Sequence, residues 1–497
     1  INIRLLNGNP HDYRKHLSSC TDDFEKLNTS NIQVDPADLP FAAQCTEPMT
    51  YCYPPQQNMF QFWTNLTIDL YGGYFMTPNG NFTNGDMGEN RGHSGGMYEN
   101  YYLHIFNNTR RIIAQCDASG ERGLSGVMRI VQAYGTLMTT DAYGPIPYSS
   151  ILSGENEVYF EFDSQKDLYK AMLEDLSTAI TDISAMGADE IAKLKSFDCW
   201  CNGDKDLWVK IANTMKLRMA LRLSKRETEA GNAGMNLKAI ATEAAQNTLA
   251  TVNKDILIDK SLENEMWLMF NWGDCGFNAN LVTIMSGTKD PRQPLYMTLN
   301  TGDIKNEAGT TTVAANSQYL GIRFASGLPA KPNSWGNFSG WIQGNNGSSY
   351  SMPLPIMKAA EAYFLLAEAK LRWDIGSESV KNLYENGIRV SMTNELAYRG
   401  AYAGIKEYPE GAVDAYINGT STQIDYTDPI KAELSTPAVN KLSVKWDESA
   451  SNEEKLERII TQKWLALFPL STEAGQNNAA PAIHASSLHS SMKVMEP

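Results

Sequence analysis

One stretch of the sequence decides the fold class: residues 356–394, which read IMKAAEAYFLLAEAKLRWDIGSESVKNLYENGIRVSMTN. Apolar side chains recur every three to four positions over 356–374 and again over 378–394, which predicts two amphipathic helices. Pro355 precedes the first helix and Gly376 separates the two. Two helices with a short turn and small residues at their crossing resemble a tetratricopeptide-type unit of about 34 residues. The stretch therefore predicts a mainly α fold built from tetratricopeptide-like helix pairs.

Helical periodicity recurs along the rest of the chain. Residues 204–231 are the clearest case, because Asp204 or Asp206 can cap the start and Gly231 can end the helix. Four further segments predict helices: 124–140, 165–183, 236–250 and 453–468. No βαβ alternation is visible, which argues against a doubly wound sheet.

Long irregular stretches separate these helices. Residues 72–97 are rich in Gly, Asn and Met, residues 286–352 in Gly, Ser, Asn and Pro, and residues 400–452 are polar and poorly periodic. Loops of this length in a compact protein are usually functional or disordered. We therefore expect one helical scaffold carrying long irregular loops that face a ligand.

Composition and charge narrow the class of partner. The chain has 497 residues, 42% hydrophobic and 20% charged, and a formal net charge of −15. An excess of carboxylates repels phosphate backbones, so nucleic-acid binding is not expected. No apolar run approaches the roughly 20 residues of a membrane-spanning helix. A membrane association would therefore require an anchor.

Six segments, in this order, resemble signatures of the SusD/RagB outer-membrane lipoproteins. They are TDAYGPIPYS at 140–149, NGD with Trp208 and ANTMKLR within 202–218, DPR at 290–292, AEAYFLLAEA at 360–369, NGIRVS at 386–391 and ITQKWLALF at 460–468. Several motifs in order are far more specific than one alone. The resemblance implies a single SusD-like domain over 20–497, with residues 1–19 uncertain and the part after about 470 divergent.

The resemblance also implies a function. SusD-like proteins of Bacteroidetes are surface lipoproteins of the outer membrane that capture a nutrient, a glycan or a peptide. They pass it to a partner SusC-like TonB-dependent transporter and need no cofactor for it. The expected location is the extracellular face of the outer membrane, through a lipid anchor. An alternative is a helical-repeat scaffold that binds only proteins.

Cys20 is the candidate lipidation site. Its context, Leu17-Ser18-Ser19-Cys20, resembles a bacterial lipobox. Residues 1–16 lack the apolar run of a signal peptide. Either that segment is not the genuine precursor or Cys20 is not lipidated.

Aromatic and amide side chains in the loops are the candidate ligand contacts. Sugar rings pack their C–H faces on aromatics, and their hydroxyls need amide or carboxylate partners. Both side-chain types occur within 335–350 and 71–84 and near 272, so we expect the ligand there. The predicted contacts are Trp335, Asn337, Phe338, Trp341, Tyr74, Phe75 and Trp272. The competing interpretation is that these aromatics only pin the loops to the scaffold.

Catalytic and metal sites find little support. Gly92-His93-Ser94-Gly95-Gly96 matches the nucleophile elbow of hydrolases, but the polar stretch 81–91 before it does not predict the required strand. Glu361 and Glu368 lie about 10 Å apart along a helix, too far for a glycosidase pair, and are expected to bond to adjacent helices. No enzyme activity is therefore expected. Calcium remains possible at Asp86 with Glu89 or at Asp425 with Asp428, although neither pair has EF-hand spacing.

Overall fold

The structure is a computed structural model that describes residues 39–476 except 56, 87, 89, 155–158 and 259–262. The chain divides into two compact units, residues 1–44 and 45–497. Cys20, Glu89 and the predicted domain boundary at residue 20 lie outside the described residues. Helix α3 (Phe41–Tyr51) begins in the first unit, and the other helices and strands that the structure describes lie in the second unit.

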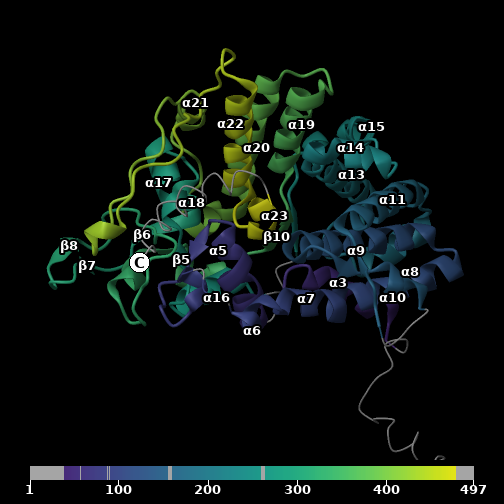
Figure 1. Cartoon of the computed structure of the whole chain (residues 1–497), viewed down its shortest axis with the longest axis horizontal. Coiled ribbons are helices and arrows are strands. Elements are labelled where there is room, and N and C mark those ends of the chain that lie inside the picture. The colour runs from purple at the N-terminus through teal and green to yellow at the C-terminus, as the bar shows by residue number, and fades with distance from the viewer. Residues whose placement is uncertain are drawn as a thin grey trace, which may run out of the picture. The chain divides into compact units, whose positions relative to one another are not determined.

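The predicted mainly α-helical fold is confirmed. Figure 1 shows α19, α20 and α22 side by side, with α13 packed on α19 and α11 and α9 following in turn. Each of the predicted helical segments overlaps one helix of the structure: α9 Arg122–Tyr143, α11 Gln165–Ser184, α13 Lys205–Arg222, α15 Leu237–Ala244, α19 Ala359–Trp373, α20 Val380–Ala403 and α22 Asn452–Leu467.

Side-chain caps explain where several helices begin. Ser164, Asp204 and Ser379 each accept a hydrogen bond from a backbone N–H in the first turn of their helix. Ser451 and Glu454 form a reciprocal capping box at the start of α22. The helix ends were less predictable: α13 stops at Arg222, well before the glycine expected to end it, and α20 continues to Ala403.

Shorter elements complete the scaffold. The remaining α-helices are α4 Gln57–Phe60, α5 Asp69–Tyr71, α6 Arg91–Ser94, α7 Gly96–Asn100, α8 Asn107–Ser119, α10 Ser149–Ser153, α12 Ala188–Lys195, α14 Glu227–Asn232, α16 Glu265–Asn271, α17 Ala279–Thr288, α18 Gln293–Tyr296, α21 Ala412–Ile417 and α23 Ser471–Gln476. The segments η2 Gln61–Ile68 and η4 Tyr101–Phe106 are π-helical. None of the helices among the described residues is both long and apolar enough to span a membrane.

Among the described residues, five small antiparallel pairs of strands tie the loops together. They are β1 Phe75–Met76 with β5 Gly276–Phe277, β2 Ile146–Pro147 with β3 Phe162–Asp163, β4 Ile256–Ile258 with β10 Leu354–Met357, β6 Met297–Asn300 with β9 Ser339–Trp341, and β7 Ile304–Lys305 with β8 Thr311–Val313. The predicted irregular stretches 72–97 and 286–352 thus contain short strands and short helices, whereas 400–452 contains the end of α20 and helix α21. Each pairing supplies backbone hydrogen-bond partners that a loop lacks on its own.

An aromatic core lies where β1, β5 and β9 meet α20 and α22. Trp341 stacks parallel to Phe277 with ring centroids 6.3 Å apart, and Phe75 and Phe468 complete the cluster. The Arg399 guanidinium, fully buried, lies 5.1 Å from the Trp341 ring centroid and 5.1 Å from that of Phe468. Cation–π contacts of this kind hold the C-terminal end of α20 against the loops.

Candidate ligand-binding site

An open recess of about 520 Å³ lies between the loops and the end of α9. Four parts of the chain line it: η2 with α5, the loop residues Asn84, Gly88 and Asn90 with Ser94 of α6, the end of α9, and α23. The volume falls within the ordinary range for small-molecule sites. The lining residues are Thr67, Ile68, Tyr71, Asn84, Gly88, Asn90, Ser94, Asp141, Ala142, Tyr143, Thr472 and Gly475.

Aromatic rings and neutral polar groups share this lining. Tyr71 is 47% exposed, which leaves much of its ring uncovered. The Tyr143 hydroxyl donates to the Ser94 carbonyl oxygen at 2.5 Å and so ties α9 to α6. Asn84 and Asn90 add amide groups. This is the combination that binds sugars, whose C–H faces stack on aromatics while their hydroxyls pair with amides.

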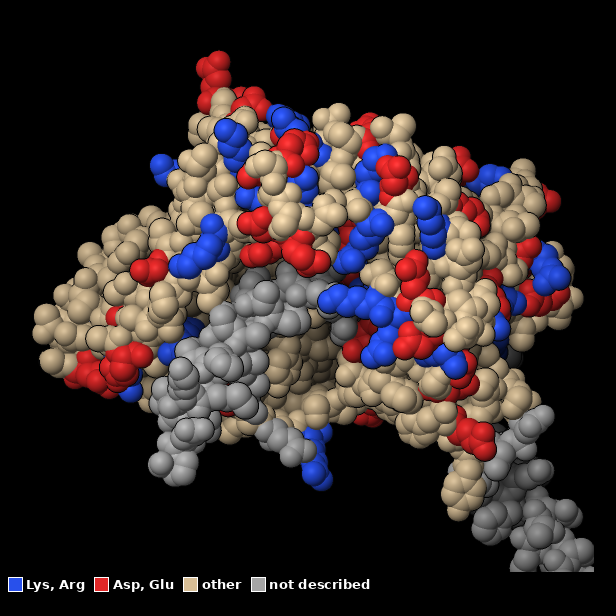
Figure 2. Space-filling model, turned by 45° about the horizontal axis from the view of Figure 1, so that its top comes forward, with Lys and Arg blue, Asp and Glu red and all other residues tan. Residues whose placement is uncertain are grey.

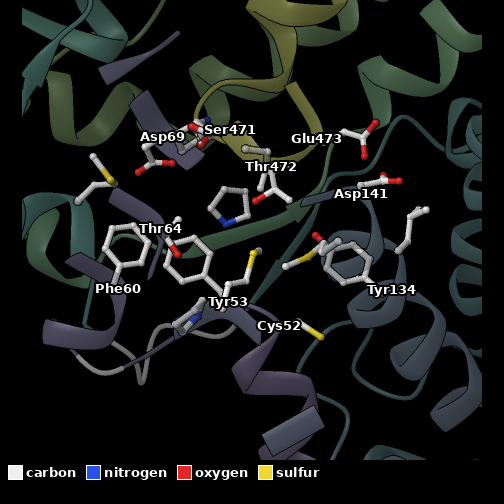
Figure 3. A pocket seen from close by; sticks show the side chains of 18 of the residues that line it. Cys52, Tyr53, Phe60, Thr64, Asp69, Tyr134, Asp141, Ser471, Thr472 and Glu473 are labelled. Atoms are coloured by element: carbon white, nitrogen blue, oxygen red, sulfur yellow. Dashed lines mark hydrogen bonds between the residues drawn. The ribbon is translucent and has the colours of Figure 1, made fainter. Parts of the chain in front are cut away.

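A second, smaller cavity of about 50 Å³ lies beside the recess. Figure 3 shows Asp69 and Ser471 on one side of it and Asp141 and Glu473 on the other. Its volume is enough for a few water molecules. Asp141 and Thr472 line both cavities, so the two are neighbours. Burial raises the pKa of Asp69 to about 6, against hydrogen bonds from Ser471 and Asn65 that lower it.

A buried ionic network supports the wall between the cavities. Arg218 of α13 donates two hydrogen bonds, of 2.8 and 2.6 Å, to the carboxylate of Glu361 on α19. Arg218 also pairs with Glu473 of α23 at 3.1 Å. Arg222 pairs with Glu473 at 2.5 Å and with Asp141 of α9. Four helices that are distant in sequence are thus joined by bonds to two guanidinium groups.

Burial and neighbouring charge compete at these carboxyls. Burial raises the pKa of Asp141 despite its contact with Arg222. Burial would also raise the pKa of Glu473, but Arg218 and Arg222 together hold it below its ordinary value. Glu361 is fully buried and bonded to α13, and Glu368 accepts a hydrogen bond from Arg372 at 2.7 Å and lies 3.8 Å from Lys463 of α22. The prediction that these two glutamates bond to adjacent helices is confirmed.

A second network joins three more of the sequence signatures. Arg292 is completely buried and forms two hydrogen bonds to Asp290, of 2.9 and 2.6 Å. It also donates to Ser391 of α20 at 2.8 Å and to Gln462 of α22 at 3.4 Å. The signatures at 290–292, 386–391 and 460–468 therefore meet in space. Their polar residues hold the scaffold together and do not line the recess.

Most of the predicted ligand contacts are buried, which is a correction. Relative exposure is 1% for Trp341, 4% for Trp335, 2% for Phe338 and 0% for both Tyr74 and Phe75. A ring packed on both faces has no surface left for a sugar. These five aromatics form the cores of the loops, because segments with little secondary structure of their own must bury large side chains to be held in place.

The remaining predicted contacts lie outside the recess lining. Asn337 is exposed and donates to the Asp303 carbonyl oxygen at 3.2 Å. Trp272 is half-buried, and its carbonyl oxygen accepts a hydrogen bond from Lys331 at 2.8 Å. The structure therefore does not gather the seven predicted residues into one site.

The recess contains residues that sequence reasoning did not single out. Thr67, Asn90, Tyr143 and Thr472 were missed, whereas Tyr71 and Asn84 fall within the predicted stretch 71–84. Tyr143 lies within the signature at 140–149, directly before Gly144, whose φ of 80° ends α9. The sequence signal that could have indicated Tyr143 was its position in a family signature at the end of a helix.

The nucleophile-elbow pattern and the candidate calcium pairs have other structural roles. Ser94 ends the four-residue helix α6, capped by Asn90, so among the described residues the strand that an elbow needs does not precede it. Asp86 accepts from the Gly327 N–H, Asp425 from the Ala438 N–H, and Asp428 from the Trp335 indole. No group of three or more potential metal ligands gathers in the part of the chain that the structure describes.

Fold and recess together define a class: helical proteins with tetratricopeptide-like helix pairs whose loops border an open recess. The chain belongs to the SusD-like family, described as Susd and RagB outer membrane lipoprotein, whose model matches residues 25–477. The match includes α23, which lies in the part expected to diverge. No curated protein matches the chain significantly.

Three solved structures illustrate the similarity. A chitin-binding SusD homolog from Flavobacterium johnsoniae has 26% identity and a TM-score of 0.75, covering 88% of this chain and 85% of the other. A SusD-like protein from Bacteroides thetaiotaomicron VPI-5482 has 26% identity and a TM-score of 0.72, with the same coverage. A SusD homolog from Bacteroides vulgatus ATCC 8482 has 25% identity and a TM-score of 0.70, covering 87% and 84%.

Proposed function

We propose that this protein captures a glycan in the recess at the cell surface and passes it to a partner SusC-like TonB-dependent outer-membrane transporter. The observation that carries the proposal is the open recess of about 520 Å³, where exposed Tyr71 lies beside Tyr143, two asparagines and several hydroxyls. Family membership supports the location in the outer membrane, and the chitin-binding neighbour supports a carbohydrate ligand. A peptide is the alternative ligand.

The proposed mechanism is binding without chemistry. Stacking on one aromatic contributes about 1 kcal/mol, and several such contacts with hydrogen bonds give affinities in the micromolar range or weaker. Weak binding suits a protein that must release its ligand to a transporter. Ser94 accepts a hydrogen bond from the Tyr143 hydroxyl through its backbone carbonyl oxygen. Binding without chemistry requires no catalytic role of the Ser94 hydroxyl.

Ligand capture is tested by filling the recess. Ala142 is exposed and lines it, whereas Ala239 on α15 is exposed and does not. The wild type, Ala142→Trp and Ala239→Trp are compared on affinity gels containing a panel of neutral and acidic polysaccharides. We expect a polysaccharide that retards the wild type and Ala239→Trp but not Ala142→Trp. Equal retardation of all three would place glycan binding elsewhere, and retardation of none would count against capture.

The partner and the anchor need separate tests. Mild-detergent pull-down from native membranes is expected to recover a TonB-dependent barrel, and recovery of the chain alone under several conditions would contradict the partnership. Lipidation at Cys20 is expected to add acyl chains to the new N-terminus, since stable anchoring takes more than one chain. Mass spectrometry that finds an unmodified peptide spanning Ser19–Thr21 in the mature protein would exclude it.

A further inference from the structure

The recess lining has no cationic side chain among the described residues. Of the twelve residues that line it, Asp141 is the single charged one, and the others are hydroxyl, amide, aromatic or apolar. An anionic ligand group placed there would lose water without gaining a positively charged partner. Burial of an unpaired charge is unfavourable.

The network beneath the recess adds negative charge. Arg218 and Arg222 face three carboxylates, those of Asp141, Glu361 and Glu473, so this cluster carries 2 − 3 = −1. Asp69 contributes a further carboxyl on the far side of the small cavity. The whole chain carries −15. The charge of this cluster and the net charge of the chain are therefore both negative.

Basic side chains on neighbouring elements do not change the negative sign of the charge around the recess. His93 stacks on Phe62, with ring centroids 4.5 Å apart, and its Nδ1 lies 3.2 Å from the Asn84 side-chain oxygen. Burial lowers the pKa of His93, which favours the neutral ring at pH 7. Arg91 lies on α6 between the lining residues Asn90 and Ser94 but is exposed and does not line the recess. Lys463 pairs with Glu368 at 3.8 Å.

We propose that the recess selects neutral glycans and rejects glycans that carry carboxylate or sulfate groups. The inference rests on the proposed function and specifies its ligand class. Neutral sugars need only hydroxyl partners and aromatic faces, which the lining supplies. Acidic sugars meet Asp141 and the excess charge behind it, a repulsive element of the kind that binding sites use for discrimination. Figure 2 shows Lys and Arg side chains mixed with Asp and Glu side chains over one face of the molecule.

Paired polysaccharides test the selectivity. The wild-type protein is run on affinity gels and titrated by calorimetry with neutral and acidic glycans in three pairs: chitin and hyaluronan oligosaccharides, galactan and polygalacturonate, and neutral and glucuronate-substituted xylan. The two xylans share one backbone, so they are the matched pair. We expect binding to at least one neutral member and at least about tenfold weaker binding to its acidic counterpart. Equal or tighter binding of the acidic member overturns the selectivity but leaves glycan capture intact. Binding of no member overturns both.

A lysine in the recess sharpens the test. Ala142→Lys places a cation in the lining near the end of α9, where the helix dipole tolerates it. Ala239→Lys adds the same charge on α15, away from the recess. We expect Ala142→Lys to bind an acidic member at least about tenfold more tightly than Ala239→Lys does, at low salt. Equal gains in both variants, or no gain in either, would show that charge in the recess does not set ligand class and would overturn the inference.

Discussion

Individual aromatic residues of two loop regions differ sharply in exposure, although each region contains both buried and exposed rings. In the stretch 335–350, Trp335, Phe338 and Trp341 are at most 4% exposed, whereas Tyr71, at the end of α5, is 47% exposed and lines the recess. The first stretch contributes β9, which pairs with β6 and brings Trp341 against β1 and β5. Tyr71 ends a helix whose other residues are buried. Aromatic content alone therefore does not identify a binding loop; what decides is whether another element covers the ring.

Truncation of a loop-core ring should have the largest effect. Trp341→Ala removes a fully buried indole from between Phe277 and Arg399, and we expect the free energy of unfolding to fall by about 3–5 kcal/mol. Chemical denaturation measures it, with Tyr350→Ala as the control because Tyr350 is 44% exposed on the same stretch. A stability close to that of the wild type would mean that the 335–350 region is not a core.

Removing one carboxylate from the ionic network under the recess should lower the free energy of unfolding somewhat less than Trp341→Ala does. Glu361→Gln leaves Arg218 with one carboxylate in a buried setting, and loss of one partner of a buried pair typically costs about 3–5 kcal/mol. Because Glu473 still pairs with Arg218, we expect a loss near the lower end, about 3 kcal/mol, from thermal unfolding. The double variant Arg218→Met with Glu361→Leu should lose less than the two single changes added together. Strict additivity would contradict a direct interaction.

Asp69 should make stability depend on pH. Its pKa is about 6 in the folded protein and about 3.9 in an unfolded chain, so the folded state holds the proton more strongly. The contribution of Asp69 is therefore most favourable below about pH 4 and is lost as pH rises through 6. As the pH rises from 4 to 7.5, we expect the free energy of unfolding of Asp69→Asn to increase by about 2–3 kcal/mol relative to that of the wild type. Urea unfolding at each pH measures this difference. A constant difference would contradict the raised pKa.

The smallest effect is expected for a substitution in the recess, measured as a change in ligand affinity. Tyr71→Ala removes one exposed ring, so affinity for the retained glycan should fall about fivefold, which corresponds to about 1 kcal/mol. The melting temperature should stay within about a degree or two, because little buried surface is lost. Tyr350→Ala, with nearly the same exposure, should leave affinity unchanged. If Tyr350→Ala weakened binding and Tyr71→Ala did not, the ligand site would lie on the 335–350 stretch as the sequence analysis expected.

The sequence by itself determined the helices and the family. Periodic apolar residues over 356–394 and 204–231 predict α13, α19 and α20, because burial of one helix face is a local pattern. Motif order indicated the family, and the same motifs proved to contain Asp141, Arg218, Glu361, Asp290 and Arg292 of the two buried networks, although not Arg222 or Glu473. The pairing of Glu361 with another helix followed from the chemistry of a buried acid, although the partner Arg218 did not.

Only the tertiary structure decided which aromatics meet solvent. Trp341 and Tyr71 have similar sequence surroundings of Gly, Asn and other aromatics, and no local pattern distinguishes them. Exposure depends on contacts between residues far apart in the chain, such as Trp341 with Phe75 and Phe468. The recess likewise joins residues 67–94 to 141–143 and 472–475. Its position follows from how α23 and α9 are held by Arg222, a long-range interaction that a one-dimensional pattern does not contain.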